Sequence, residues 1–135
     1  MLRLDPAVRE AVVDHAREGA PAEVCGVLGG RYDATASTVT ASRRAENVAA
    51  TPRTRYELDP AEQLRLMDDI EETGADVVGF YHSHPAGPAG PSETDAAQAT
   101  WEGYSYVIVD LSAAPSVGAW RWTGEAFERE EVEVE

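Results

Sequence analysis

The sequence predicts an α+β fold in which helices pack in layers against a sheet joined largely by hairpins. Two observations lead to this prediction. Segments with helix-capping residues and helical apolar spacing are interspersed with short runs rich in β-branched and aromatic residues. The last strands follow one another with no helix between them, as in hairpins. The length of 135 residues suits one domain with its own core, so we expect a single domain over residues 1–135.

The first elements are a short strand, a helix and two further strands. Residues 1–4 fit an edge strand. Asp5 is a good N-cap and Pro6 a good first helical residue, so a helix begins there, and Gly19 ends it. The inward face of this helix carries apolar residues at helical spacing, namely Val8, Val12, Val13 and Ala16. A buried strand is then expected at 23–29, and a second strand near 37–44.

A second helix and the most apolar strand occupy the middle of the chain. Asp59 and Pro60 open the helix, and Gly74 ends it. We expect three of its residues to face inward, namely Leu64, Met67 and Ile70. The strand runs from about residue 76 to residue 84, because its residues are apolar, β-branched or aromatic and the proline that follows cannot donate a ladder hydrogen bond.

The last part of the chain combines a rigid loop, a third helix and further strands. The loop is 86–91, which contains only Ala, Gly and Pro. Ser92 begins a helix that continues to Glu102 and stops at Gly103. Residues 127–134 are either a final strand or a frayed acidic tail. Two more strands are expected, at 104–111 and 117–122.

The composition excludes several classes of function. The formal net charge is −14, from 25 acidic and 11 basic residues, which argues against a nucleic-acid partner because phosphate backbones need basic patches. All the basic residues are Arg, and an acidic chain without lysine is typical of salt-loving archaea, so we expect a halophile. No run approaches the ~20 apolar residues of a membrane span, and no signal-peptide core is present. We therefore expect a cytoplasmic protein with no membrane partner.

Three potential metal ligands fall close together: His82, His84 and Asp95. Alternate side chains of a strand point to one face, so the two histidines lie together at the end of their strand. A loop then brings Asp95 in as a third ligand. Zinc that is held by three protein side chains keeps a fourth position for water, as catalytic sites do. The sequence therefore predicts one zinc ion per chain.

Ser92 has two compatible interpretations. A serine followed three residues later by an acidic residue is a capping box, which starts a helix whatever the function. The same helix start also holds Asp95 firmly, and a metal ligand must be held firmly.

The motif His82-x-His84, seven residues and then Ser92-x-x-Asp95 resembles the signature of the JAMM (MPN+) metallopeptidases. That family has a glutamate in a Pro-x-Glu-x-Cys-Gly context, which here is Pro21-Ala22-Glu23-Val24-Cys25-Gly26. The resemblance covers nearly the whole chain and is closest to the short, stand-alone archaeal desampylases. It implies a cytidine-deaminase-like fold with a curved, mostly antiparallel sheet flanked by helices. The middle of the chain also matches, at Asn47, Pro52, Tyr56 and Leu58-Asp59-Pro60.

The resemblance implies a zinc-dependent isopeptidase and peptidase. His82, His84 and Asp95 would be the metal ligands. Glu23 would take a proton from zinc-bound water and pass it to the leaving amine, and Ser92 would donate a hydrogen bond to the developing oxyanion. The implied partners are ubiquitin-like small archaeal modifiers, released from lysines and linear fusions after their Gly-Gly ends.

The binding surface for such a substrate is open to interpretation. Glycine alone passes a narrow channel, and main-chain hydrogen bonds can hold an extended tail, so residues 45–56 and 86–91 are candidate walls. Cys25 is the only cysteine and forms no internal disulfide; it is either a small buried residue or an oxidation-sensitive neighbour of the metal. Four arginines form either a contact for an acidic modifier or solvated surface, namely Arg43, Arg44, Arg53 and Arg55.

Other functions stay open at this point. The same site would suit a peptidase that processes the C-terminus of a sulfur-carrier protein. A non-catalytic MPN scaffold is a second alternative, although such domains lose metal ligands that this chain keeps. A zinc hydrolase acting on nucleic acids or small molecules is a third, and the acidic charge counts against nucleic acids. We expect a monomer or a weak homodimer.

Overall fold

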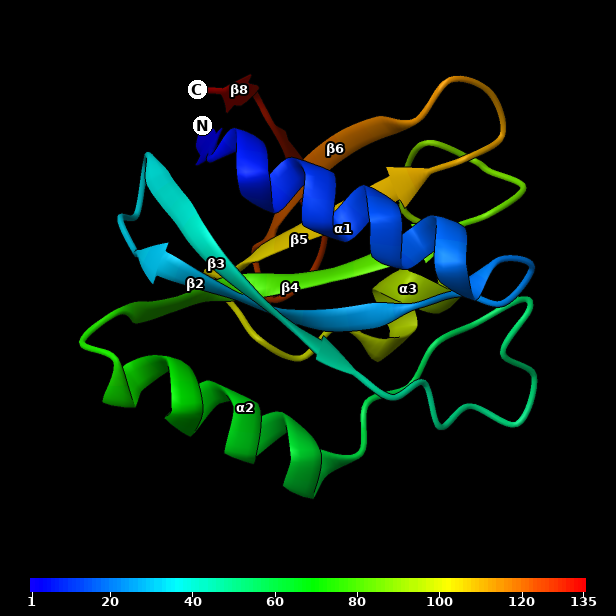
Figure 1. The fold of residues 1–135 in the computed structure, drawn as a ribbon, viewed down its shortest axis with the longest axis horizontal. Helices are drawn as coiled ribbons and strands as arrows, with labels where there is room; N and C mark the ends of the chain where they lie inside the picture. Colours follow the sequence, from blue (N-terminus) through cyan, green and yellow to red (C-terminus); the bar gives the residue numbers. More distant parts are fainter.

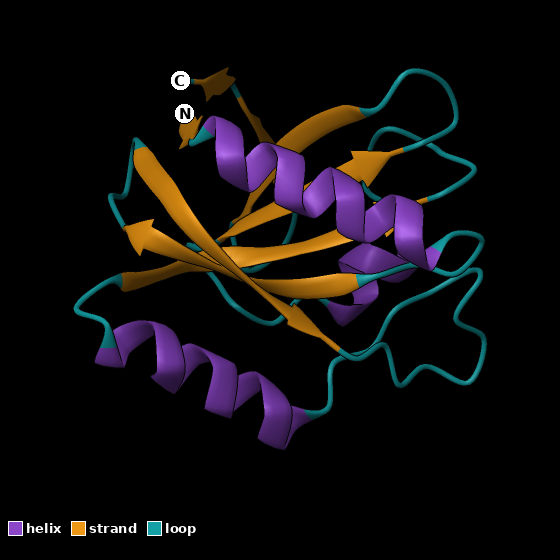
Figure 2. Ribbon diagram, viewed as in Figure 1, coloured by secondary structure: helices purple, strands orange, loops and turns teal.

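The computed structural model describes all 135 residues and confirms an α+β fold, with three helices and eight strands (Figure 2). In chain order, the elements are β1 (Leu2–Leu4), α1 (Pro6–Gly19), β2 (Cys25–Arg31), β3 (Ser37–Ala45), α2 (Pro60–Glu72), β4 (Asp76–His84), α3 (Glu93–Gln98), β5 (Ser105–Asp110), β6 (Ser116–Trp122), β7 (Phe127–Glu130) and β8 (Val132–Val134). None of the helices combines the length and the apolar character that crossing a bilayer requires.

All eight strands form one sheet, in the order β7-β6-β5-β4-β2-β3-β1-β8. Four neighbouring pairs are antiparallel and three are parallel. β7 and β8 lie at opposite ends of this order, yet only Glu131 separates them in the chain. The sheet must therefore curve until its edges approach one another, and the two chain ends lie close together (Figure 1).

The prediction of an edge strand at residues 1–4 is wrong. β1 pairs with β3 on one side and with β8 on the other, both in parallel. Residues 127–134 form two strands, of which β7 pairs with β6 and β8 covers the open side of β1. These pairings join the two ends of the chain, so no local pattern in the sequence reports them.

Helix α1 packs inside the curve of the sheet. Its N-cap is Asp5, whose side chain accepts a hydrogen bond from the Ala7 amide at 2.8 Å. The helix shares one hydrophobic core with β1 and with strands from both halves of the strand order. As the sequence predicts, the buried residues of the helix are Val8, Val12, Val13 and Ala16.

Helices α2 and α3 pack on the other face of the sheet, where a second core forms. The buried residues of α2 are Leu66, Met67 and Ile70, whereas Leu64 is 56% exposed. The prediction that Leu64 faces inward is therefore wrong. At about 100° of arc per residue, Leu64 lies roughly 110° from the centre of the buried face, so it cannot reach the sheet.

Helix α3 is shorter than the sequence predicts. It ends at Gln98, because Ala99 adopts an extended backbone conformation, whereas the expected end was Glu102. Trp101 then packs in the aromatic group on this face of the sheet, 5.8 Å from the ring of Phe80. Gly103, the expected helix stop, instead takes a positive φ of 84° in the turn before β5.

Candidate metal centre

The centre of the sheet delivers two histidines to one point. β4 lies between β2 and β5, and His82 and His84 are at the C-terminal end of β4. These residues are 2% and 4% exposed, respectively. The loop after β4 returns the chain to the start of α3, where Asp95 is 3% exposed. Glu23 joins them just before β2, so that four residues each present one ligand atom, and these atoms lie within 4.8 Å of one another.

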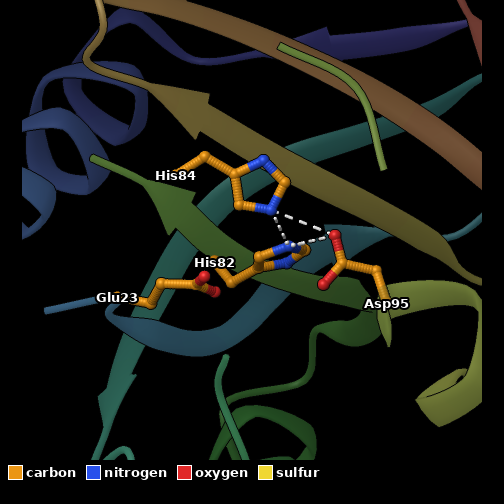
Figure 3. A group of neighbouring side chains, drawn as sticks. All are labelled: Glu23, His82, His84 and Asp95. Atoms are coloured by element: carbon orange, nitrogen blue, oxygen red, sulfur yellow. Dashed lines mark hydrogen bonds and ion pairs between the residues drawn. The ribbon is translucent and has the colours of Figure 1, made fainter. Parts of the chain in front are cut away.

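Three of these atoms form a compact triangle, which we call the ligand triangle: His82 Nε2, His84 Nε2 and Asp95 Oδ2 (Figure 3). The sides measure 3.2 Å between the two nitrogens, and 3.1 and 3.0 Å from the nitrogens to the oxygen. Ligands at about 2.0–2.1 Å from a tetrahedral ion are separated by about 3.3 Å. The triangle therefore has the size of three corners of a tetrahedral metal site.

The surroundings of the histidines orient their rings. His84 Nδ1 lies 2.7 Å from the Pro88 carbonyl oxygen. A carbonyl only accepts, so Nδ1 carries the proton and the Nε2 of the neutral ring presents a lone pair to the triangle. The ring of Tyr56 stacks on His82 with centroids 4.2 Å apart. A hydrogen bond on one ring and an aromatic stack on the other thus fix both orientations before any ion arrives.

The capping box that the sequence predicts is present, and it positions the third ligand. Ser92 Oγ accepts from the Asp95 amide at 3.0 Å, and the Ser92 amide donates to Asp95 Oδ2 at 2.9 Å. Asp95 Oδ2, which completes the capping box by accepting from the Ser92 amide, is thus the same atom that faces both histidines. The structural and the functional interpretations of this motif coincide in one side chain.

Protonation in the triangle follows from burial and from these contacts. Burial opposes ionisation of Asp95, but the hydrogen bonds to His82 and His84 outweigh it and hold the pKa of the carboxyl well below its usual range. Burial lowers the pKa of His82. For His84 burial acts the same way, but Asp95 and the Pro88 carbonyl raise the pKa overall.

Glu23 is held by main-chain contacts rather than by the strand ladder, because β2 begins at Cys25 and not at 23 as predicted. Its amide donates to the Pro52 carbonyl at 2.7 Å, and its carbonyl accepts from Asn47 Nδ2 at 2.9 Å. The next residue, Val24, exchanges two hydrogen bonds with Ser83 of β4, at 2.9 and 3.1 Å. The position of Glu23 is therefore fixed by two other segments, 47–52 and the end of β4.

The Glu23 carboxylate points toward the ligand triangle with one oxygen left over (Figure 3). Oε1 is buried and has no hydrogen-bond partner. No other buried side-chain oxygen or nitrogen in the protein lacks a partner. Burial, reinforced by the negative charge of Asp95 and opposed by His84, raises the pKa of Glu23 to about 7. A buried acceptor without a donor is costly, which indicates that a group from outside the chain is expected there.

Asn47 connects the segment 46–59 to this carboxylate. Its amide group makes four hydrogen bonds: Nδ2 donates to the carbonyls of Glu23 and Arg55, and Oδ1 accepts from the amides of Ala49 and Glu57. The sequence marked Asn47 through the family pattern alone, without a role. Because all its partners are main-chain groups, no side-chain pattern in the sequence reveals them.

A cavity of about 430 Å³ adjoins the ligand triangle on the side of α2 and α3. Tyr56 is shared by the two, since its ring stacks on His82 and also lines the cavity. The other lining residues are Glu57, Leu58, Pro60, Gln63, Phe80, Ala97, Gln98, Thr100, Trp101 and Tyr106.

Cys25 is a buried neighbour of the centre and not part of it. It is 0% exposed and pairs with His82 across the sheet. Burial raises the pKa of the thiol to about 12, so the reactive thiolate is scarce at neutral pH. Of the two interpretations of this residue, the small buried one fits the structure.

Comparison with known proteins gives consistent matches. A family model that describes prokaryotic homologues of the JAB domain matches residues 5–123. A desampylase of Haloferax volcanii is 49% identical over 138 residues, which cover 99% of this chain and 96% of that protein. A CysO-cysteine peptidase of Mycobacterium tuberculosis is 39% identical over 103 residues, or 73% of this chain and 66% of that protein. A solution structure of a protein from Desulfitobacterium hafniense aligns with a TM-score of 0.90 at 32% identity, covering 100% of this chain and 93% of that one.

Proposed function

Since the chain belongs to the family of prokaryotic JAB-domain proteins, we propose that it is a zinc-dependent peptidase that releases ubiquitin-like modifier proteins from lysine side chains and linear fusions after a C-terminal Gly-Gly. The observation that carries this proposal is the ligand triangle beside the unpartnered Glu23 Oε1. The 49% identity to a desampylase over almost the whole length of both chains supports the substrate class. We place the enzyme in the cytoplasm, with one zinc ion per chain.

The triangle suits zinc in its donors as well as its size. Two imidazole nitrogens and one carboxylate oxygen are ordinary zinc ligands, and three of them leave a fourth position open. Zinc bound there would polarise a substrate carbonyl and lower the pKa of a water molecule toward ~7. Asp95 is ionised and the His84 Nε2 is oriented inward, so the chain itself supplies the protonation and tautomer that such an ion requires.

Glu23 is the proposed general base and acid. Its pKa of about 7 lies near the working pH, where a carboxylate can both accept and return a proton efficiently. It would take a proton from the attacking water and deliver it to the nitrogen of the departing lysine or peptide. The unpartnered Oε1 is the atom available for that proton.

Ser92 is the proposed donor to the substrate carbonyl oxygen. In the capping box its Oγ accepts a hydrogen bond, so the hydroxyl hydrogen is uncommitted. It would stabilise the negative charge that develops on the oxygen as the carbonyl carbon becomes tetrahedral. We further propose that segments 45–56 and 86–91 flank the Gly-Gly tail, since Pro52 touches Glu23 and Pro88 touches His84.

A related peptidase activity is the second candidate. The identity of 39% to a CysO-cysteine peptidase favours processing of a sulfur-carrier protein at its C-terminus. The same triangle and the same base would serve, because only the leaving group differs. A non-catalytic scaffold role does not account for a complete ligand set or for the orphaned Glu23 oxygen.

The proposal is tested by metal content and cleavage together. The protein is purified in molar salt, its zinc is counted, and it is given a ubiquitin-like protein joined to lysine by an isopeptide bond, alongside a linear fusion. We expect one zinc per chain and cleavage that is lost on chelation. Glu23→Gln should keep its zinc and lose cleavage, whereas Glu10→Gln, an exposed matched control on α1, should keep both. A Glu23→Gln variant that still cleaves would remove the base from the mechanism, and absence of zinc would end the proposal.

A further inference from the structure

The four arginines that the sequence groups together separate into two kinds. Arg44 forms an ion pair with Glu18 of α1, and Arg43 donates to the carbonyl of its neighbour Ser42. Arg53 and Arg55 are exposed and form no ion pair. Other arginines of the chain are also unpaired, so what distinguishes these two is their position.

Both arginines lie at the rim of the metal centre. Arg53 directly follows Pro52, whose carbonyl accepts the hydrogen bond from the Glu23 amide. The Arg55 carbonyl is bonded to Asn47, which also holds the Glu23 carbonyl. In Figure 1 their segment lies at the same end of the sheet as the loop that leads into β2.

Arg55 also reaches toward the cavity beside the triangle. With the amide of Gln98 oriented to satisfy both of its neighbours, Gln98 accepts from Arg55 Nη2 at 2.7 Å and donates to the Tyr56 carbonyl at 2.9 Å. Gln98 and Tyr56 both line the cavity. The contact to a neutral amide positions the guanidinium beside a residue that lines the cavity and leaves its charge uncompensated.

We propose that Arg53 and Arg55 form a recognition site for acidic side chains in the substrate tail, in the residues that precede its Gly-Gly end. This inference rests on the proposed function and adds a specificity to it. Carboxylates pair with guanidinium groups through charge-assisted hydrogen bonds, which persist at close range when salt screens longer interactions. A chain of net charge −14 would repel an acidic tail. The positive charges of the two arginines would offset this repulsion at the rim of the metal centre.

The test uses two peptides that differ only in charge. Each ends in Gly-Gly joined to the side chain of a lysine in a labelled peptide; one has glutamates before the Gly-Gly, and the other has glutamines at the same places. Rates are measured at the lowest salt at which the enzyme is folded by circular dichroism. The enzymes are the unsubstituted chain, the double variant Arg53→Glu with Arg55→Glu, and Arg31→Glu. Arg31 is exposed and unpaired at the far end of β2, so its replacement makes the same charge reversal at a single position away from the site, half the total change of the double variant.

We expect the unsubstituted enzyme to prefer the glutamate peptide by about tenfold in kcat/KM, mainly through KM. The double variant should lose or reverse that preference and still cleave the glutamine peptide, and Arg31→Glu should keep the preference. The neutral pair Arg53→Gln with Arg55→Gln should abolish it without reversal. Equal cleavage of both peptides by the unsubstituted enzyme, or a preference that survives in the double variant, overturns the inference and leaves the proposed function standing. Cleavage of neither peptide overturns the proposed function and the inference with it.

Discussion

Replacing Ser92 separates its two roles, because the structure divides them between different atoms. The hydroxyl oxygen caps α3 by accepting from the Asp95 amide, whereas catalysis would use the hydroxyl hydrogen. The donor of the hydrogen bond to Asp95 Oδ2 is the main-chain amide of Ser92, so this bond survives substitution by alanine, glycine or threonine. Asp95 therefore stays held in the ligand triangle in every Ser92 variant, and zinc binding should persist.

The magnitudes for alanine and glycine differ in stability but not in catalysis. Serine to alanine at an N-cap costs about 1 kcal/mol, whereas glycine costs only a few tenths. Loss of an oxyanion donor lowers the rate by about 10²–10³, whichever residue replaces it. Ser92→Ala should thus lose both stability and turnover, and Ser92→Gly should lose turnover alone. Ser92→Thr keeps a hydroxyl and should stay close to the unsubstituted enzyme.

The assay pairs urea unfolding with kcat and KM on an isopeptide-linked substrate, with zinc counted in each variant. The donor role requires the same fall in kcat for alanine and glycine despite their different stabilities. A glycine variant with unimpaired kcat would refute the donor role and leave Ser92 as a cap only. A fall in kcat that follows the loss of zinc would refute the reasoning that the main-chain amide alone holds Asp95.

Three further predictions concern the supporting structure. Asn47→Ala removes four hydrogen bonds, two of them to part-buried groups, and should lower the unfolding free energy by about 1–3 kcal/mol and slow turnover. The control Thr54→Ala, in the same segment, should change stability and turnover little. Equal effects of the two substitutions would contradict the role of Asn47 in holding Glu23. Burial, with Arg44 nearby, lowers the pKa of His15 from 6.5 to about 4, so the unfolded chain binds more protons between these values and stability falls as the pH drops through this window. His15→Gln should lose less stability than the unsubstituted chain between pH 7 and pH 4.5 in urea titrations, and an identical loss would show that His15 is not the group responsible. The net charge of −14 predicts that unfolding free energy falls on dilution from molar salt, where the Debye length is about 3 Å; equal stability at low salt would oppose a halophilic adaptation.

The local part of the site could be predicted because it depends on spacing alone. His82 and His84 share a face of β4 by strand alternation, and Ser92 and Asp95 form a capping box by helical spacing. The same local signals located the start of α1 and the extent of β4. At the third helix the local signal failed: Gly103 suggested the helix end, but α3 ends at Gln98 and Trp101 packs beside Phe80 beyond it.

The sequence by itself thus determined which side chains are candidates for the chemistry, since ligand type, interval and turn residues are properties of short segments. Only the tertiary structure decided how Glu23 is aimed, through Pro52, Asn47 and the contact of Val24 with Ser83. It also decided that β8 covers β1. These features are hydrogen bonds that main-chain groups make with distant segments. Every residue offers the same amide and carbonyl groups, so the pairing of such groups leaves almost no trace in the sequence and becomes fixed only when the sheet closes around α1.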